Sequence, residues 1–147
     1  MKRILAVASS GGHWIQLCRL HPVFNGYQVS YLSTNIEHAK EVDGKLYTVI
    51  DANQWSKFRM ALMFLQVAWV LIKSRPDVII STGAAVGLAA ILWGKVIGAK
   101  TIWVDSIANA EELSGSGAKV GRFADVWLTQ WEHLARPGGP QYWGSVL

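Results

Sequence analysis

A short polar segment near the N-terminus has the residue types that bind a phosphate and move a proton. Ser9-Ser10-Gly11-Gly12-His13 follows an apolar run that predicts a strand and precedes a segment that predicts a helix. Glycines let a backbone approach a ligand closely, and the N–H groups at a helix N-terminus favour an anion. We therefore predict that Ser9, Ser10, Gly11 and Gly12 bind a phosphate or diphosphate, and that His13 is a general base or a phosphate contact. A tight turn in which His13 only packs or caps explains the pattern equally well.

Two other strand ends carry small or polar residues. Ser81-Thr82-Gly83 precedes an Ala/Gly-rich segment, and Asp105-Ser106 follows a further apolar run. We predict that Ser81, Thr82, Gly83 and Ser106 contact substrate, and that Asp105 is catalytic, because a carboxylate there could accept a hydroxyl proton or hold a sugar. Close helix packing for the first group and turn capping for Asp105 are the alternatives. Neither segment has the spacing of a dinucleotide fingerprint or a P-loop.

Strand and helix signals alternate along the chain. Apolar runs predict strands at 3–8, 27–32, 45–50, 77–81, 101–104 and 126–129. Helices are predicted after His13 and at 55–74, 84–97, 118–123 and 131–135, with a tail at 141–147 and a mobile loop at 109–119. Because the strand runs are apolar throughout, we predict a Rossmann-like α/β fold, with a mostly parallel sheet and helices on both faces, in one domain of residues 1–147. The polar segments then meet at the carboxyl edge of the sheet.

Composition narrows the possible functions. The net charge is +4, but the basic residues are scattered, which argues against nucleic-acid binding. Cys18 is the one cysteine, so no disulfide forms within the chain, and the absence of His/Cys/Asp/Glu clusters with ligand spacing predicts no metal and no cofactor. No signal peptide is visible, and we expect a cytoplasmic protein.

One long apolar segment indicates contact with a membrane or a partner. Residues 60–72 read MALMFLQVAWVLI and are flanked by basic residues, but they are too few for the roughly 20 residues of a membrane span. We predict a helix with one buried face and a second face on membrane or partner, with Trp55, Phe58 and Trp69 at headgroup level. A helix buried between sheet and partner is the alternative.

The segments together resemble a known family. They are similar to the membrane-recruiting subunit of the two-chain UDP-N-acetylglucosamine transferase of dolichol-linked oligosaccharide synthesis, and more closely to its bacterial relatives in capsule and exopolysaccharide synthesis. The residues that carry this resemblance lie at 9–13, 76–84, 98–106, 113–117, 124–125, 130–132 and 142–146.

The resemblance implies the N-terminal, acceptor-side half of a GT-B glycosyltransferase. A second, catalytic chain would resemble the C-terminal half and hold most of the UDP-sugar site, and the acceptor would be a polyprenyl-diphosphate-linked saccharide. Trp131, Glu132, Tyr142, Trp143 and Gly144 would form the partner interface. The protein would then lie peripherally on the inner face of the cytoplasmic membrane.

The chain departs from the family pattern in two ways, and its residues also fit two other functions. Family members often have Glu-Ser and then a basic residue where this chain has Asp105-Ser106 and Asn109, and the dolichol-pathway subunit has an N-terminal transmembrane helix that this sequence does not show. A non-catalytic adaptor that recruits the transferase, or a free-standing flavodoxin-like nucleotide-binding enzyme, would also fit the residues.

Overall fold

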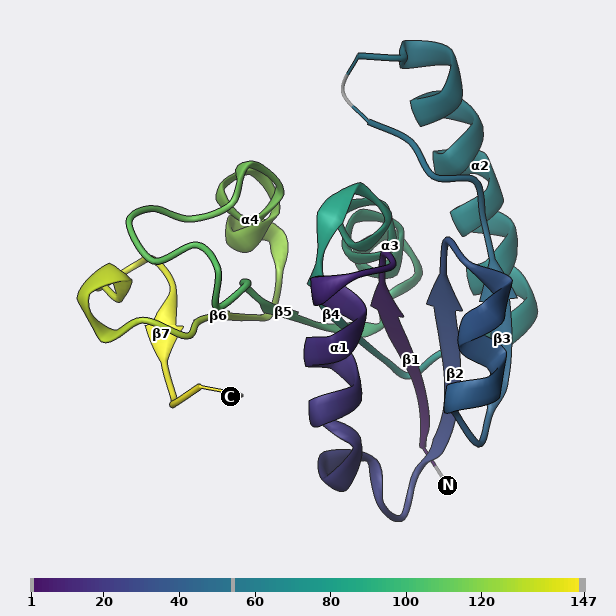
Figure 1. Cartoon of the computed structure of the whole chain (residues 1–147), viewed down its shortest axis with the longest axis horizontal. Coiled ribbons are helices and arrows are strands. Elements are labelled where there is room, and N and C mark those ends of the chain that lie inside the picture. The colour runs from purple at the N-terminus through teal and green to yellow at the C-terminus, as the bar shows by residue number, and fades with distance from the viewer. Residues whose placement is uncertain (1, 54, 146–147) are drawn as a thin grey trace.

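Parallel strands form a single sheet in the computed structural model of the chain, which describes residues 2–53 and 55–145. The order across the sheet is β3-β2-β1-β4-β5-β6-β7 (Figure 1). Every neighbouring pair is parallel. The strands are β1 (Arg3–Ala8), β2 (Gln28–Ser33), β3 (Lys45–Thr48), β4 (Val78–Gly83), β5 (Lys100–Val104), β6 (Val126–Thr129) and β7 (Gln141–Tyr142).

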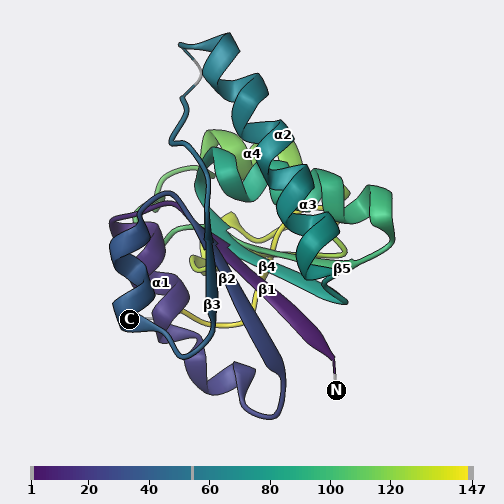
Figure 2. The ribbon, with the colours of Figure 1, turned by 90° about the vertical axis from the view of Figure 1, so that its right-hand side faces the viewer.

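Helices cover both faces of the sheet. Helix α1 lies on one face, and α2 and α3 lie on the other (Figure 2), with α4 packed beside α3. The helices are α1 (Gly12–Arg19), α2 (Lys57–Ser74), α3 (Ala84–Ile97) and α4 (Gly115–Val120), with 3₁₀ helices at His21–Phe24, Ile36–Glu41, Gly121–Phe123 and Glu132–Leu134. The predicted Rossmann-like α/β fold is thereby confirmed. None of the helices in the described part is long and apolar enough to cross a bilayer.

The apolar strands arise because both faces are buried. In β1, Leu5 and Val7 join a core shared with α2 and α3, whereas Ile4 and Ala6 join a second core under α1. Alternate residues of a strand point to opposite faces, so a strand covered on both sides needs apolar residues at every position.

Small residues bring α3 close to the sheet. A Cβ added at Gly87 would lie 2.1 Å from the Ser81 hydroxyl oxygen, and one added at Gly94 would lie 2.5 Å from Cδ1 of Ile79. The Ala/Gly-rich sequence of α3 therefore serves close packing on β4 and β5, as the packing alternative for Ser81-Thr82-Gly83 predicted.

Several segments differ from the sequence prediction. The tail begins with β7, because Gln141 and Tyr142 pair with Leu128 and Thr129 and so satisfy the backbone at the edge of β6. The 3₁₀ helix at Ile36–Glu41 was not predicted, and its start is capped by the Asn35 side chain, which accepts from the Glu37 N–H. The region predicted as a mobile loop contains α4, which starts earlier than the helix predicted at 118–123.

The strand order places a topological switch point at the middle of the sheet. β1 lies between β2 and β4, and the chain leaves β1 for α1 on one face but leaves β4 for α3 on the opposite face. Ligands of open α/β sheets bind at such a switch point. A flavodoxin-like sheet would place β3 beside β1, so the observed order contradicts that alternative.

Candidate functional site

The turn between β1 and α1 is open to solvent. Ser10, Gly11 and Gly12 are exposed, and Ser9 and His13 are half-buried. Gly11 has φ 86° and ψ −140°, a conformation that is essentially restricted to glycine. A Cβ at Gly11 or Gly12 would meet no atom within 4 Å, so the space in front of the turn is free. The first N–H groups of a helix have no partner within it, and those of α1 are therefore available to an anion.

His13 joins this turn to the end of β4. Its Nδ1 lies 3.2 Å from the Thr82 carbonyl oxygen, and the Thr82 hydroxyl donates to the His13 carbonyl oxygen at 2.6 Å. A Cβ at Gly83 would lie 2.3 Å from Nδ1, so only glycine leaves room for the ring. The sequence prediction that the two segments face one crevice agrees with this contact.

The Thr82 contact sets the tautomer of His13. A carbonyl oxygen only accepts hydrogen bonds, so Nδ1 must carry the hydrogen. In the neutral ring Nε2 is then the basic nitrogen, able to accept a proton or a hydrogen bond. The ring is therefore held in a form that suits a general base, and the protonated ring would suit a phosphate contact.

The backbone is strained where β4 meets α3. Gly83 has φ 145° and Ala84 has φ 70°, so two consecutive residues have positive φ. A left-handed alanine costs about 1–2 kcal/mol. Such strain persists only where surrounding contacts enforce it, and it is concentrated at functional sites.

Ser81 and Thr82 have buried side chains that hold the site in place. Both side chains are fully buried, and the Ser81 hydroxyl accepts from the Gly83 N–H at 3.1 Å. In this arrangement they hold the turn and His13 in place, while the exposed part of the predicted phosphate-binding set is the segment Ser10 to Gly12. The Ser10 N–H also donates to the Thr34 hydroxyl at 3.3 Å, which ties the turn to the end of β2.

Asp105 has a buried carboxylate with three donors. It accepts from the Trp103 indole at 3.0 Å and from the Ser114 hydroxyl and N–H at 2.6 and 2.9 Å. Asp105 is 1% exposed, and its bonds do not include His13. The Asp105 carboxylate therefore holds the segment between β5 and α4 in place, which corresponds to the turn-capping alternative.

A buried polar network links α1 to the ends of β5 and β6. The Gln16 amide donates to the Ser106 hydroxyl at 3.0 Å, and its carbonyl accepts from the Ile107 N–H and the Gln130 amide at 3.2 and 2.6 Å. Gln130 also donates to the Asp105 carbonyl at 2.9 Å. Sequence reasoning missed Gln16, although a glutamine on the apolar face of a short helix is itself a signal of a buried partner.

The predicted interface residues divide into two groups. The Trp131 indole donates to the Ile107 carbonyl at 2.7 Å, so Trp131 belongs to the same network, while Glu132 is exposed. Trp143 is 67% exposed and Tyr142 is 41% exposed. Trp143 and Gly144 border an apolar hollow of about 350 Å³ over β4, β5 and β6, on the α1 side.

A second hollow of about 260 Å³ continues the same apolar face. Its walls include Tyr27 and Val78, and it shares Val23, Ile80 and Ile102 with the first hollow. Both hollows are lined by strand residues of the second core, on the α1 side of the sheet.

Two titratable groups near α1 have shifted pKa values. Burial, followed by the charge of Glu41, raises the pKa of the half-buried Cys18 thiol, so the thiol stays protonated. Hydrogen bonds from His38 and Trp14 lower the pKa of Glu41. In the described ranges no three His, Cys, Asp or Glu side chains are grouped so that they could hold a metal ion.

Known structures share this architecture. The chain superposes over its full length on 46% of the MurG chain of Acinetobacter baumannii, with a TM-score of 0.82 and 15% identity. It superposes over 90% on 40% of the UDP-N-acetylglucosamine 2-epimerase of Rickettsia bellii, with a TM-score of 0.70 and 16% identity. The UDP co-structure of S. aureus MnaA matches 88% of the chain on 38% of its own, with a TM-score of 0.68 and 16% identity. The chain thus spans less than half of each neighbour.

The fold is that of the N-terminal half of a GT-B protein. The family described as "Oligosaccharide biosynthesis protein Alg14 like" matches residues 24–146, and the chain belongs to this family. Proteins of the family are partner subunits of a catalytic glycosyltransferase. No curated protein matches the sequence closely enough to add a relationship.

Proposed function

We propose that the chain is the acceptor-side subunit of a two-chain GT-B glycosyltransferase of capsule or exopolysaccharide synthesis. It would bind a polyprenyl-diphosphate-linked saccharide and bring the catalytic, donor-binding subunit to the membrane for transfer from a UDP-sugar. The observation that carries this proposal is the exposed Ser10–Gly12 turn beside His13, at the switch point of a chain from a glycosyltransferase-subunit family.

The chemistry of the turn fits a diphosphate. Helix N-terminal N–H groups and the Ser10 hydroxyl can donate to phosphate oxygens, and the positive end of the α1 dipole favours their charge. Gly11 and Gly12 leave the backbone uncovered, so a bulky diphosphate can approach it. The bond to Thr82 holds His13 next to this turn, where it would contact the diphosphate or accept the proton of the acceptor hydroxyl.

The donor half would come from a second chain. The family of partner subunits to which the chain belongs supports this proposal, and the chain matches less than half of MurG and of the epimerases. The exposed Tyr142 and Trp143, with the apolar hollows beside them, are the surface we propose for docking that chain. Aromatic side chains at the edge of an apolar hollow are typical of protein interfaces. No metal or cofactor is needed for this role, and the protein would lie peripherally on the inner face of the cytoplasmic membrane.

The test is sugar transfer by the two chains together. The partner to use is a chain that resembles a GT-B C-terminal half, to be sought among the genes next to that of this chain, and the acceptor is a short polyprenyl-diphosphate saccharide in detergent. We expect His13→Ala to lower kcat/KM by about 10²–10⁴-fold, the range for loss of a general base. His13→Gln, which keeps hydrogen bonding without the base, separates proton transfer from binding. A complex that assembles with Trp143→Ala as tightly as with the wild type would remove the proposed docking surface.

A non-catalytic adaptor is the second candidate, and one observation favours it. His13 and Asp105 are both engaged in hydrogen bonds that hold the fold, so neither needs a catalytic role to explain its place. In that case His13→Ala leaves transfer unchanged while the complex stays intact. Calorimetry of the isolated chain with UDP and UDP-sugars checks the remaining possibility, a nucleotide site within this chain alone.

A further inference from the structure

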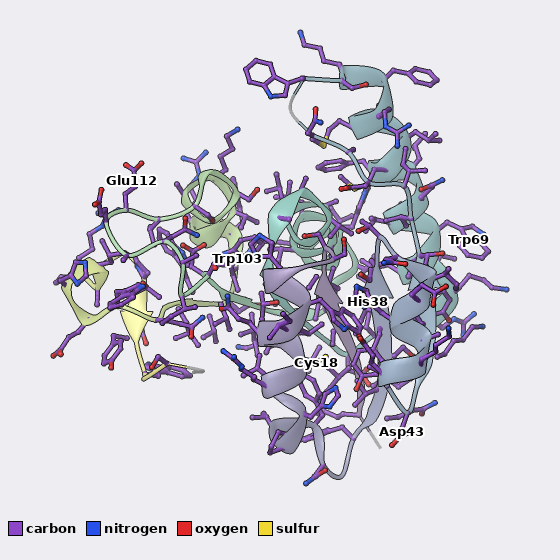
Figure 3. The ribbon with its side chains drawn as sticks, in the orientation of Figure 1. Cys18, His38, Asp43, Trp69, Trp103 and Glu112 are labelled. Carbon is purple, nitrogen blue, oxygen red and sulfur yellow. The ribbon has the colours of Figure 1, made fainter. Side chains whose placement is uncertain are left out.

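A continuous stripe of exposed apolar side chains runs along α2. Trp55 precedes the helix, and the stripe continues through Phe58, Leu62, Leu65, Trp69 and Ile72. Steps of four and three residues keep side chains on one helical face, and the helical members follow that spacing without interruption. Figure 3 shows Trp69 pointing away from the sheet.

The stripe faces away from the core. The buried side chains of α2 are Met63, Val67, Val70 and Leu71, on the opposite side of the helix. Trp55 is 85% exposed and Phe58 is 81% exposed, and the other members of the stripe are exposed to lesser degrees. Contiguous apolar surface of this kind marks a site of protein or membrane contact.

The charged side chains of α2 itself are all basic. Residues 52–76 contain no Asp or Glu, whereas Lys57, Arg59, Lys73 and Arg75 flank the helix at both ends. The Lys73 ammonium lies 5.5 Å from the centre of the Trp69 ring, directly beside the stripe. Tryptophans next to basic residues on an amphipathic helix are typical of the headgroup region of anionic bilayers.

The orientation of α2 connects this surface to the candidate site. Its N-terminal end stands beyond the carboxyl edge of the sheet (Figures 1 and 2), which is the edge at which the β1–α1 turn opens. A bilayer in contact with Trp55 and Phe58 would therefore lie on the side of the molecule from which a lipid-linked diphosphate approaches the turn.

We propose that the α2 stripe inserts into the surface of an anionic phospholipid bilayer, and that this contact orients the β1–α1 turn toward the membrane. The inference deepens the proposed function and rests on its membrane-bound acceptor. An anionic bilayer matches both the apolar side chains of the stripe and the flanking lysines and arginines. A protein partner or a second copy of the chain would need an acidic surface to match the same basic residues.

The experiment is co-sedimentation of the full chain with vesicles. One set of vesicles is phosphatidylcholine alone, and the other contains about 30% phosphatidylglycerol. We expect Phe58→Ser/Leu65→Ser/Trp69→Ser to lower the partition constant at least about tenfold on the anionic vesicles. Lys57→Glu/Lys73→Glu should remove the preference for anionic vesicles, and added salt should do the same.

The matched control changes equally exposed apolar residues away from the stripe. Ile36→Ser/Val96→Ser alters side chains that are 62% and 74% exposed, and it should change binding less than about twofold. Circular dichroism confirms that each variant is folded. Equal sedimentation of the wild type and the stripe variant overturns the inference, as does a wild-type dimer that the stripe variant makes monomeric, or loss of partner binding in the stripe variant.

The two proposals fail separately. Transfer in detergent with a short acceptor does not require a bilayer, so it tests the proposed function alone. If that transfer persists while the wild type does not bind anionic vesicles, only the α2 inference is lost. If vesicle binding follows the stripe but no transfer occurs with the partner, the proposed function is lost.

Discussion

His13 and Thr82 are bonded to each other in both directions, although they are 69 residues apart in the chain. The ring Nδ1 faces the Thr82 carbonyl oxygen at 3.2 Å, and the Thr82 hydroxyl donates to the His13 carbonyl oxygen at 2.6 Å. This pair joins the turn after β1 to the end of β4, and it therefore fixes how these two segments lie against each other.

Gly83→Ala should break this arrangement. The new Cβ would lie 2.3 Å from His13 Nδ1, and the φ of 145° disfavours any side chain. We expect a loss of unfolding free energy above the roughly 1–3 kcal/mol of backbone strain alone, because the ring must also move. Urea denaturation measures the loss.

Thr82→Val gives the milder comparison. It keeps the shape of the buried side chain but removes one hydrogen bond, which is worth about 1 kcal/mol. A Gly83→Ala protein as stable as Thr82→Val would show that the ring moves aside without cost.

The sequence predicts the fold well because burial leaves a strong pattern. The strands at 3–8 and 126–129 and the helix at 84–97 were predicted with the bounds that the structure shows, since apolar runs and a C-terminal Gly98 mark them directly. β7 was missed because two polar or aromatic residues have no periodicity, and only pairing with β6 makes them a strand.

The site was predicted less completely, because sequence shows residue types but not which way a side chain turns. The exposed Ser10–Gly12 turn and its contact with the end of β4 follow from strand–turn–helix patterns. The burial of Asp105 under Trp103 and Ser114, and the bonds of Gln16 to Ser106, depend on contacts between distant segments. No local pattern contains that information.

Gly11 and Gly12 should respond differently to the same substitution. Gly11→Ala forces a side chain into φ 86° and ψ −140°, at a cost of about 1–3 kcal/mol. Gly12→Ala adds a Cβ in open space at the start of α1, and it should leave stability within about 0.5 kcal/mol of the wild type. Thermal and urea unfolding of the two variants provide the comparison.

The same pair also tests binding. If the turn holds a diphosphate through its backbone, Gly12→Ala should weaken binding of the acceptor by the partner-bound complex without loss of stability, because the methyl group occupies the approach. Unchanged KM for the acceptor in Gly12→Ala would place the diphosphate elsewhere.

Gln16→Leu should destabilise the protein through its partners. The change removes the acceptor of the Ile107 N–H and one of the acceptors of the Gln130 amide, and a buried unsatisfied donor costs about 1–3 kcal/mol. Gln28→Leu is a control at an exposed position and should change stability by less than about 0.5 kcal/mol. Hydrogen exchange of the segment 106–114 should also speed up in Gln16→Leu alone, since this segment is tied to α1 through that side chain.

Asp125 should contribute stability that is lost in acid. Its carboxylate accepts from the Thr101 N–H and hydroxyl at 2.8 and 3.1 Å, and the backbone bond is the main reason that its pKa is lowered. A carboxyl group with a lowered pKa in the folded state stabilises the protein above its unfolded pKa of about 3.9, and this contribution disappears as the pH falls through the folded value. Because Asp125 is exposed, we expect Asp125→Asn to cost only about 0.5–1 kcal/mol at pH 7.

Urea unfolding from pH 7 to pH 2.5 should show the wild type and Asp125→Asn converging below about pH 4. The control variant Glu112→Gln, at an exposed loop position, should follow the wild type throughout. A constant difference between wild type and Asp125→Asn across the whole range would mean that shape, and not the charge on the Thr101 bonds, holds the start of β5 to the segment before β6.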